Sequence, residues 1–409
     1  MNGRPTVEQE VQMPERTPPV HFAPAARVDA LPLNFWDAID REVARLSAEP
    51  GPRMIDVSKG SPDLPTPPHI VQAMQRAVAN PSHHRYNAFT GYAPLREAIA
   101  MRYREDHGVD LDPDSQVVTF SGSHEALMAA IIALADPGST VVLPDPGYPM
   151  YFSGVDLAGA TIATLPLVEP GYAPDFDALR DLDEARVLML NYPNNPTGAV
   201  ATRQIFEDAL TFSRRVGAAF IHDFAYSALG AGGSRPLSAL SVDRDTERTV
   251  ELQTVSKTYS MAGWRVGYAA GNPSIIDAMR RYQAHAYSLI FGATQEAAAA
   301  ALTGDQSVVD EIVAVYERRR TIVVDGLRAI GWDVIDSVGT FFVWVRISGD
   351  AVEFARILRE EARVAVGPGD GFGSRGRGHI RLGLTLDDDT LREMIDRLAQ
   401  ITLPTVSIR

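Results

Sequence analysis

The chain has 409 residues, 45% of them hydrophobic and 22% charged, a composition typical of a globular protein large enough for more than one domain. Its net charge of -14 argues against nucleic acid or an anionic membrane as a partner, and without cysteine it can form neither disulfides nor Cys-type zinc sites. We find no signal-peptide pattern and no apolar run near the roughly 20 residues of a membrane helix, so we expect a cytoplasmic location and no membrane partner.

The first segments in chain order are a proline-rich arm and a helix. Residues 1–30 are rich in proline and show little periodicity, which predicts an extended or disordered arm. Apolar residues at helical spacing predict a helix over 33–46, which Pro50-Gly51-Pro52 ends. A short strand over 54–57 then leads to a turn, 58–63, whose backbone N–H groups could face a ligand.

The middle of the chain alternates between strand and helix patterns. Expected strands are 116–120, 140–143, 161–165, 187–190 and 219–222, and expected helices between and around them are 70–78, 94–105, 124–135, 150–158 and 203–216. This alternation predicts an α/β fold with a mostly parallel, seven-stranded-type sheet sandwiched by helices. A helix-rich stretch, 295–329, then leads to a pattern of antiparallel strands, 332–335, 341–347 and 379–384, with a helix over 351–361. We therefore expect a large domain over 63–303, and a smaller α+β domain formed by 31–62 and 304–409.

Polar or aromatic residues stand in several loops that we expect at the carboxyl ends of strands. They are Ser121, Tyr148, Asn191, Asp223 and Lys257. In a parallel sheet, ligands bind beyond the carboxyl ends of the strands. The sequence thus predicts one ligand site that gathers all five loops.

The segment from Ser256 to Gly267 indicates what this ligand is. Lys257 stands among small hydroxyl residues, and Arg265 follows eight positions later. An amine in a partly dry pocket near another cation loses proton affinity and can form a Schiff base. Arginine offers a planar fork of donors that suits a phosphate. Together the two side chains favour a carbonyl cofactor that carries a phosphate, and pyridoxal 5'-phosphate fits this description.

Other motifs supply groups for such a cofactor. The turn Ser121-Gly122-Ser123 opens a helix whose N–H groups suit a phosphate, with Thr254 or Ser256 as further donors, although many such turns bind nothing. Tyr148 could stack on a planar ring or simply pack between its prolines. In the constrained run from Asn191 to Gly198, the Asn195 amide could hold a phenolate oxygen, to which Tyr226 could also donate. Asp223 could keep a pyridinium nitrogen protonated or merely cap a turn.

Three motifs together resemble the fold-type I pyridoxal phosphate enzymes of the aspartate aminotransferase class (aminotransferase class I/II). They are Asn195-Pro196-Thr197-Gly198, Asp223 with Tyr226, and Ser256-Lys257 with Gly263-Trp264-Arg265. The resemblance runs from about Leu33 to the last helix. It implies the Schiff base at Lys257, Asp223 at the pyridine nitrogen, Asn195 and Tyr226 at the ring hydroxyl, Tyr148 on the ring, and Gly122, Ser123, Thr254 and Arg265 at the phosphate.

The same resemblance implies contacts with the substrate and with a second subunit. Arg381 matches the arginine that clamps the substrate α-carboxylate, Gly60 matches a glycine whose backbone meets that carboxylate, and Asn195 lies beside the substrate as well. Tyr86, five residues before Gly91, would reach the phosphate of the partner subunit, which implies a homodimer. The Asn195–Pro196 bond is commonly cis in such relatives.

We therefore predict a transaminase that moves an amino group between an L-amino acid and a 2-oxo acid through Lys257, with Asp223 and Tyr226 also catalytic. The alternative is an enzyme of the same fold that uses the cofactor for elimination or replacement, oxidation or carbon–carbon bond formation. A silent regulatory protein is disfavoured because every cofactor residue is present. Residues 287–292 carry no arginine, which tilts the prediction away from aspartate and glutamate as main substrates. The histidines lack ligand spacing, so we predict no metal.

Overall fold

The computed structural model describes residues 22–29, 31, 35–230, 232, 234–287, 289–336 and 338–401. Of the predicted N-terminal arm, residues 1–21 and 30 lie outside this part, and Ala26–Asp29 form a one-turn helix, α1. None of the helices in the described ranges has both the length and the apolar character that crossing a bilayer requires.

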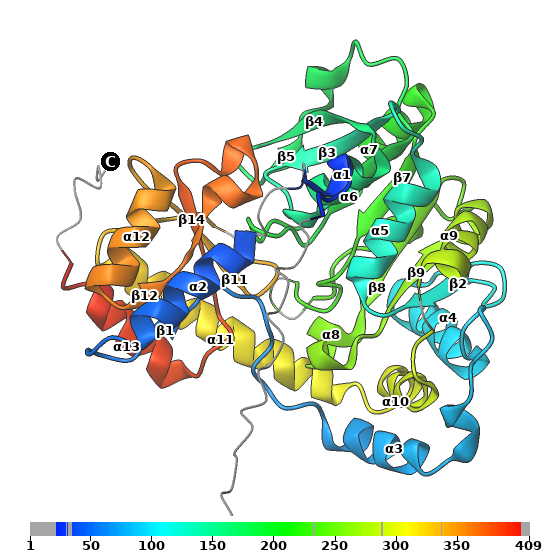
Figure 1. Cartoon of the computed structure of the whole chain (residues 1–409), viewed down its shortest axis with the longest axis horizontal. Coiled ribbons are helices and arrows are strands. Elements are labelled where there is room, and N and C mark those ends of the chain that lie inside the picture. Colours follow the sequence, from blue (N-terminus) through cyan, green and yellow to red (C-terminus); the bar gives the residue numbers. More distant parts are fainter. Residues whose placement is uncertain are drawn as a thin grey trace, which may run out of the picture.

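The larger sheet lies among helices in the right-hand half of the view in Figure 1. In the described residues it has eight strands in the order β2-β9-β8-β7-β6-β3-β4-β5. Their bounds are β2 Val117–Phe120, β3 Thr140–Asp145, β4 Thr161–Val168, β5 Ala173–Pro174, β6 Val187–Asn191, β7 Ala219–Asp223, β8 Thr249–Thr254 and β9 Gly267–Gly271. The pairs from β8 to β4 are parallel, whereas β9 runs antiparallel to both of its neighbours and the two-residue β5 runs antiparallel to β4. The predicted mostly parallel α/β sheet is confirmed.

Alternate residues of the strands face helices on opposite sides of this sheet, as expected for strands buried on both faces. Met189 and Ile221 belong to the apolar cluster that also includes α5 and α6, whereas Leu190 and Phe220 pack with α7. The helices associated with this sheet are α3 Pro68–Val78, α4 Ala93–His107, α5 Ser123–Leu134, α6 Met150–Ala158, α7 Arg203–Val216, α8 Val255–Thr258, α9 Pro273–Ala286 and α10 Gly292–Thr303.

The C-terminal part forms a separate antiparallel sheet to one side of the large one (Figure 1). In the described residues it contains β10 Asp333–Val334, β11 Phe342–Arg346, β14 His379–Gly383 and β13 Gly367–Pro368, in that order. β1 (Ile55–Asp56) pairs in parallel with β12 (Val364–Ala365). The helices here are α2 Phe35–Ser47, α11 Ser307–Ala329, α12 Ala351–Glu361 and α13 Asp388–Leu398. The N-terminal helix and strand thus join the C-terminal elements, while the domain boundaries at 62/63 and 303/304 remain a prediction.

Three strands of the large sheet were not among the predicted elements: the two-residue β5, β8 and β9. β8 places the polar side chains of Glu251 and Gln253 in the interior, where hydrogen bonds satisfy them, so the segment does not read as an apolar run. β9 begins and ends with glycine. A Cβ at Gly267 would lie 2.4 Å from the backbone nitrogen of Ser123, so only glycine permits this close approach.

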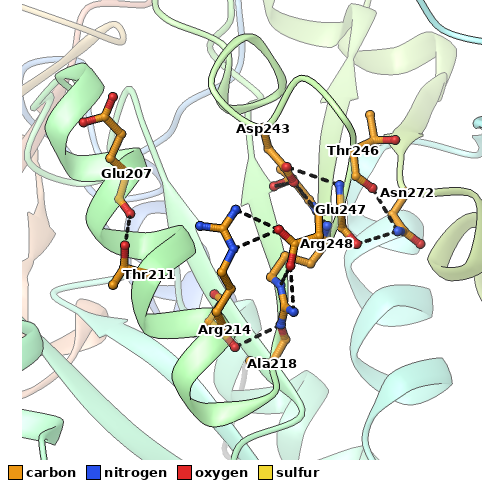
Figure 2. Close-up of polar contacts among 11 residues, drawn as sticks. Glu207, Thr211, Arg214, Ala218, Asp243, Thr246, Glu247, Arg248 and Asn272 are labelled. Carbon is orange, nitrogen blue, oxygen red and sulfur yellow. Dashed lines mark hydrogen bonds and ion pairs between the residues drawn. The ribbon is translucent and has the colours of Figure 1, made fainter.

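A buried carboxylate fixes the start of β8 (Figure 2). Asp243 accepts hydrogen bonds from the backbone N–H groups of Glu247, Arg248 and Thr249, at 3.1–3.2 Å, and from the Thr249 hydroxyl at 2.7 Å. Asn272 donates from the other side to the carbonyls of Thr246 and Glu247. This network sets the register from which β8 runs to the loop that carries Lys257.

We expect Asp243→Ala to lower the free energy of unfolding by about 2–4 kcal/mol, because it leaves the buried N–H and hydroxyl of Thr249 and two partly buried N–H groups without an acceptor. Chemical denaturation measures the change. Glu207→Ala, an acidic residue exposed on nearby α7, is the matched control and should change stability by less than about 0.5 kcal/mol. Equal effects of the two substitutions would contradict a structural role for the Asp243 network.

Candidate active site

A cavity of about 370 Å³ opens at the carboxyl ends of the parallel strands. Asn191 and Asp223 end β6 and β7, and Lys257 follows β8 by three residues. Eight of the predicted site residues line the cavity: Gly60, Ser123, Tyr148, Asn195, Asp223, Tyr226, Lys257 and Arg381. The structure thus brings together segments that are more than 300 residues apart in the sequence.

Lys257 lies at the centre of this cavity. Its Nζ donates a hydrogen bond to the carbonyl of Gly60 at 2.6 Å and lies 5.4 Å from the centre of the Phe341 ring. Burial, with the nearby Arg381 and Arg265 cations, lowers the pKa of Lys257 from 10.5 to about 8. About a tenth of the amine is therefore neutral at pH 7, and this neutral form can attack a carbonyl.

Asp223 supplies the buried carboxylate of the site. Its Oδ2 accepts a hydrogen bond from the Tyr151 hydroxyl at 2.7 Å, and its Oδ1 accepts one from the N–H of Ala225 at 3.3 Å. Burial raises the pKa of Asp223, while the Tyr151 hydrogen bond acts in the opposite direction. Tyr151 was not predicted as a site residue. Its only signal is its position three residues after Tyr148, at the start of a helix.

The loop after β6 is held by a ladder of amide hydrogen bonds. The Asn191 side chain donates to the carbonyl of Asp223 and accepts from the N–H of Asn195, both at 2.7 Å. The Asn195 Oδ1 accepts from Arg381 Nη1 at 2.7 Å, which turns its amide nitrogen to the opposite side. The Asn195–Pro196 bond is cis, as the resemblance implies.

Arg381, on β14, is a buried cation with an open donor. Its guanidinium lies against the rings of Trp36, Phe342 and Phe372, at 3.9–4.8 Å from their centres. Nη2 donates to the carbonyl of Ser58, whereas Nε is buried and has no hydrogen-bond partner among the described residues. Burial lowers the pKa of Arg381 to about 10, so the group stays charged near neutral pH. The open donor suits a carboxylate.

The helix N-terminus of α5 fits a phosphate. Gly122 has φ +94°, and a Cβ there would lie 2.2 Å from Nη2 of Arg265, so glycine allows the guanidinium to lie across the helix end. That Nη2 donates to the carbonyl of Ser121 at 3.3 Å. Of the residues predicted at the phosphate, Ser123 lines the cavity, whereas Ser121, Gly122, Thr254, Ser256 and Arg265 do not. The hydroxyl oxygens of Thr254 and Ser256 lie 2.7 Å apart and hold the turn that leads to Lys257.

Tyr86 lies away from the cavity of its own chain. Its side chain is fully exposed, on a surface that also exposes Phe89 and Phe291.

The structure adds cavity-lining residues that were not among the predicted site residues. They are Trp36, Asp40, Lys59, Ser61, His124, Leu127, Asn191, Ala225 and Phe342. Of these, Lys59 and Ser61 lie in the turn 58–63, and Asn191 lies in a loop at a strand end, both of which the sequence indicates as facing a ligand. Several of these come from α2 and the loop after β1, which belong to the N-terminal part of the chain.

The comparisons with known proteins agree with this geometry. Residues 52–398 match the family described as aminotransferase class I and II. L-glutamine–4-(methylsulfanyl)-2-oxobutanoate aminotransferase of Bacillus subtilis is 43% identical, over 92% of this chain and 95% of that protein. LL-diaminopimelate aminotransferase of Desulforudis audaxviator is 39% identical, over 92% of this chain and 97% of that protein. The substrate-bound structure of BacF from Bacillus subtilis has a TM-score of 0.90 and 36% identity, and the match covers 95% of this chain and 100% of that one.

The chain therefore belongs to the aminotransferase class I and II family, and its fold and reaction are those of a transaminase. Membership of this family implies pyridoxal phosphate as the cofactor.

The lowered pKa of Lys257 can be measured directly, because Lys59 and Lys257 are the only lysines in the chain. Only the neutral amine reacts with an aldehyde, so in cofactor-free protein we expect the labelling rate of Lys257 to have its midpoint near pH 8. Lys59 is the internal control, since its ion pair with Asp40 raises its pKa above 10.5. Borohydride trapping of a small aldehyde, followed by peptide mass spectrometry, gives both profiles. Coinciding profiles would contradict the assignment.

Proposed function

We propose that the chain binds pyridoxal 5'-phosphate through a Schiff base at Lys257 and transfers the amino group of an L-amino acid to a 2-oxo acid. One observation carries the proposal. A lysine of lowered pKa, a buried carboxylate and a buried arginine with an open donor line the same cavity. These are the groups needed to form a covalent bond with the cofactor, to neutralise the positive charge of its ring nitrogen and to bind the α-carboxylate of a substrate.

Each residue has a task that its surroundings suit. When bound, the cofactor supplies the aldehyde and an electron-accepting ring. Lys257, with a pKa of about 8, removes a proton from the substrate Cα and returns it as general acid, because its pKa lies near the working pH. Asp223 holds a positive ring nitrogen, since an opposite charge in a dry site favours the charged form. Tyr226 and Asn195 donate to the ring hydroxyl, and Tyr148 covers the ring.

The remaining groups orient the two anionic ends. Gly122, Ser123 and Arg265 bind the phosphate at the N-terminus of α5, and Ser121, Thr254 and Ser256 hold the turns around it. At the other end, Arg381 and the backbone of Gly60 bind the substrate α-carboxylate. The open Nε of Arg381 supports this assignment.

We propose a homodimer in which Tyr86 contacts the phosphate in the partner's site. The exposed aromatic side chains of Tyr86, Phe89 and Phe291 support a partner on this surface, since large exposed apolar patches commonly mark interaction sites. We also propose a cytoplasmic location, which suits a chain without disulfides.

Isotope transfer tests the reaction. We expect the holoenzyme to move ¹⁵N from labelled L-glutamine or LL-diaminopimelate, donors named for the relatives, to 4-(methylsulfanyl)-2-oxobutanoate, with mass spectrometry as the readout. Lys257→Ala should abolish turnover, because the other lysine of the cavity, Lys59, is held in an ion pair with Asp40 at 2.7 Å and does not replace the Lys257 amine. Free ammonia without labelled amino-acid product would favour elimination or oxidation over transamination.

The Tyr151–Asp223 hydrogen bond gives a second test. It stabilises the Asp223 carboxylate, which is ionised only above its pKa, so Tyr151→Phe should raise that pKa and move the acid limb of the kcat/KM profile to higher pH. We also expect kcat/KM at the optimum to fall about tenfold. Tyr192→Phe, which removes a buried hydroxyl that donates only to the Tyr172 carbonyl, is the control. An unchanged acid limb in Tyr151→Phe would contradict this role.

A further inference from the structure

Both lysines of the chain line the same cavity. The chain has no other lysine, so Lys59 is the only primary amine side chain besides Lys257. Lys59 directly precedes Gly60, whose carbonyl accepts the hydrogen bond from Lys257. The residue next to Gly60 in the sequence therefore carries a second cation into this cavity.

Lys59 forms an ion pair with Asp40 at the mouth of the cavity. The distance from Nζ to Asp40 Oδ1 is 2.7 Å, and each side chain is about half exposed. Asp40 lies on α2, whereas Lys59 follows β1, so the pair joins two N-terminal segments beside the smaller sheet (Figure 1). Asp56 lies farther from Nζ, at 3.7 Å, and its Oδ1 already accepts from the N–H and hydroxyl of Ser58.

The other charged groups of the cavity wall already have tasks. Under the proposed function, Lys257 and Asp223 serve the cofactor and Arg381 serves the α-carboxylate. Among the described residues that line the cavity, Asp40 and Lys59 are the remaining Asp, Glu, Lys or Arg side chains. Together they have no net charge, but they offer both ammonium donors and a carboxylate acceptor.

We propose that the Asp40–Lys59 pair selects amino-acid substrates whose side chain ends in a neutral group with both a hydrogen-bond acceptor and a donor. The acceptor binds Lys59 and the donor binds Asp40. An apolar end makes neither bond, and a lone carboxylate meets repulsion from Asp40. This inference rests on the proposed transamination.

Two kinds of side chain share this chemistry. One is the carboxamide of L-glutamine, and the other is the ammonium and carboxylate at the far end of LL-diaminopimelate, which are neutral together. Both compounds appear in the names of similar enzymes. The half-exposed position of the pair at the cavity mouth is open enough for either, so the two are compared directly in the test.

The test measures kcat/KM of the holoenzyme for four donors: L-glutamine, LL-diaminopimelate, L-glutamate and L-norleucine, whose apolar side chain has a similar length. In the unmodified enzyme, kcat/KM for L-glutamine or for LL-diaminopimelate, or for both, should exceed kcat/KM for L-norleucine. Lys59→Met should lower kcat/KM for that donor about tenfold, through the loss of a charged hydrogen bond, and change norleucine less than about threefold.

The two partners should change the use of glutamate in opposite directions, which a purely structural role would not do. Asp40→Asn removes the repulsion and should raise kcat/KM for glutamate, relative to that for norleucine, by about threefold or more. Lys59→Met should lower the same ratio. Arg53→Met is the matched control, because it breaks an exposed 2.7 Å ion pair with Glu393, which does not line the cavity. It should leave all four values unchanged.

The outcomes separate this inference from the proposed function. Transamination in the unmodified enzyme with equal losses for all donors in Lys59→Met would overturn the specificity role alone. So would a preference for norleucine, or glutamate values that move in the same direction in both variants. If no amino acid donates its amino group to any oxo acid, the proposed function fails and this inference fails with it.

Discussion

The charge balance around Lys257 is the constraint on which the rest of the site depends. An amine that must bond a carbonyl and move a proton has to be neutral part of the time, and burial beside two arginines brings this about. The same burial disfavours the Asp223 carboxylate, whose negative charge would otherwise restore the lysine's proton affinity. The Tyr151 hydroxyl and the N–H of Ala225 stabilise the negative charge of that carboxylate by donating hydrogen bonds to it. Hydrogen bonds from the protein thus offset part of the cost of burying this charge.

This charge balance requires that the backbone around Lys257 and Asp223 is held in place, and the large sheet holds it. β6, β7 and β8 run in parallel. Asn191 pairs with Asp223, whose partner on β8 is Leu252, so β8 continues two residues further to Thr254 at the same edge of the sheet. Deeper in the sheet, His222 is 2.8 Å from Glu251 and 2.9 Å from the Tyr192 carbonyl, with both side chains fully buried. This contact connects β7 to β8 and to the loop after β6. It thus stabilises the relative positions of the loops that follow these three strands.

The sequence was sufficient for the groups that follow strands and carry distinctive chemistry. Asp223 and Asn195 could be placed at the cavity because parallel strands place their carboxyl ends together. Lys257 could be placed there from its own motif, and Arg381 from the family resemblance. Tyr151 could not, since a tyrosine at a helix start resembles any packing residue. β8 was missed because Glu251 and Gln253 are satisfied by partners distant in the sequence, which no local pattern reveals. Asp40 and Lys59 were missed for the same reason.

Residues from both sheets line the cavity, and the two sets have different proposed tasks. The large sheet contributes Lys257 and Asp223, whose chemistry is the same for every amino acid. The segments beside the smaller sheet contribute Gly60, Arg381, Asp40 and Lys59, which contact the substrate rather than the cofactor under the assignments proposed here. Asn195 bridges the two sets through its hydrogen bond to Arg381. Under these assignments, the groups that hold and balance the lysine come from the large sheet, while Arg381, Asp40 and Lys59 come from the smaller side.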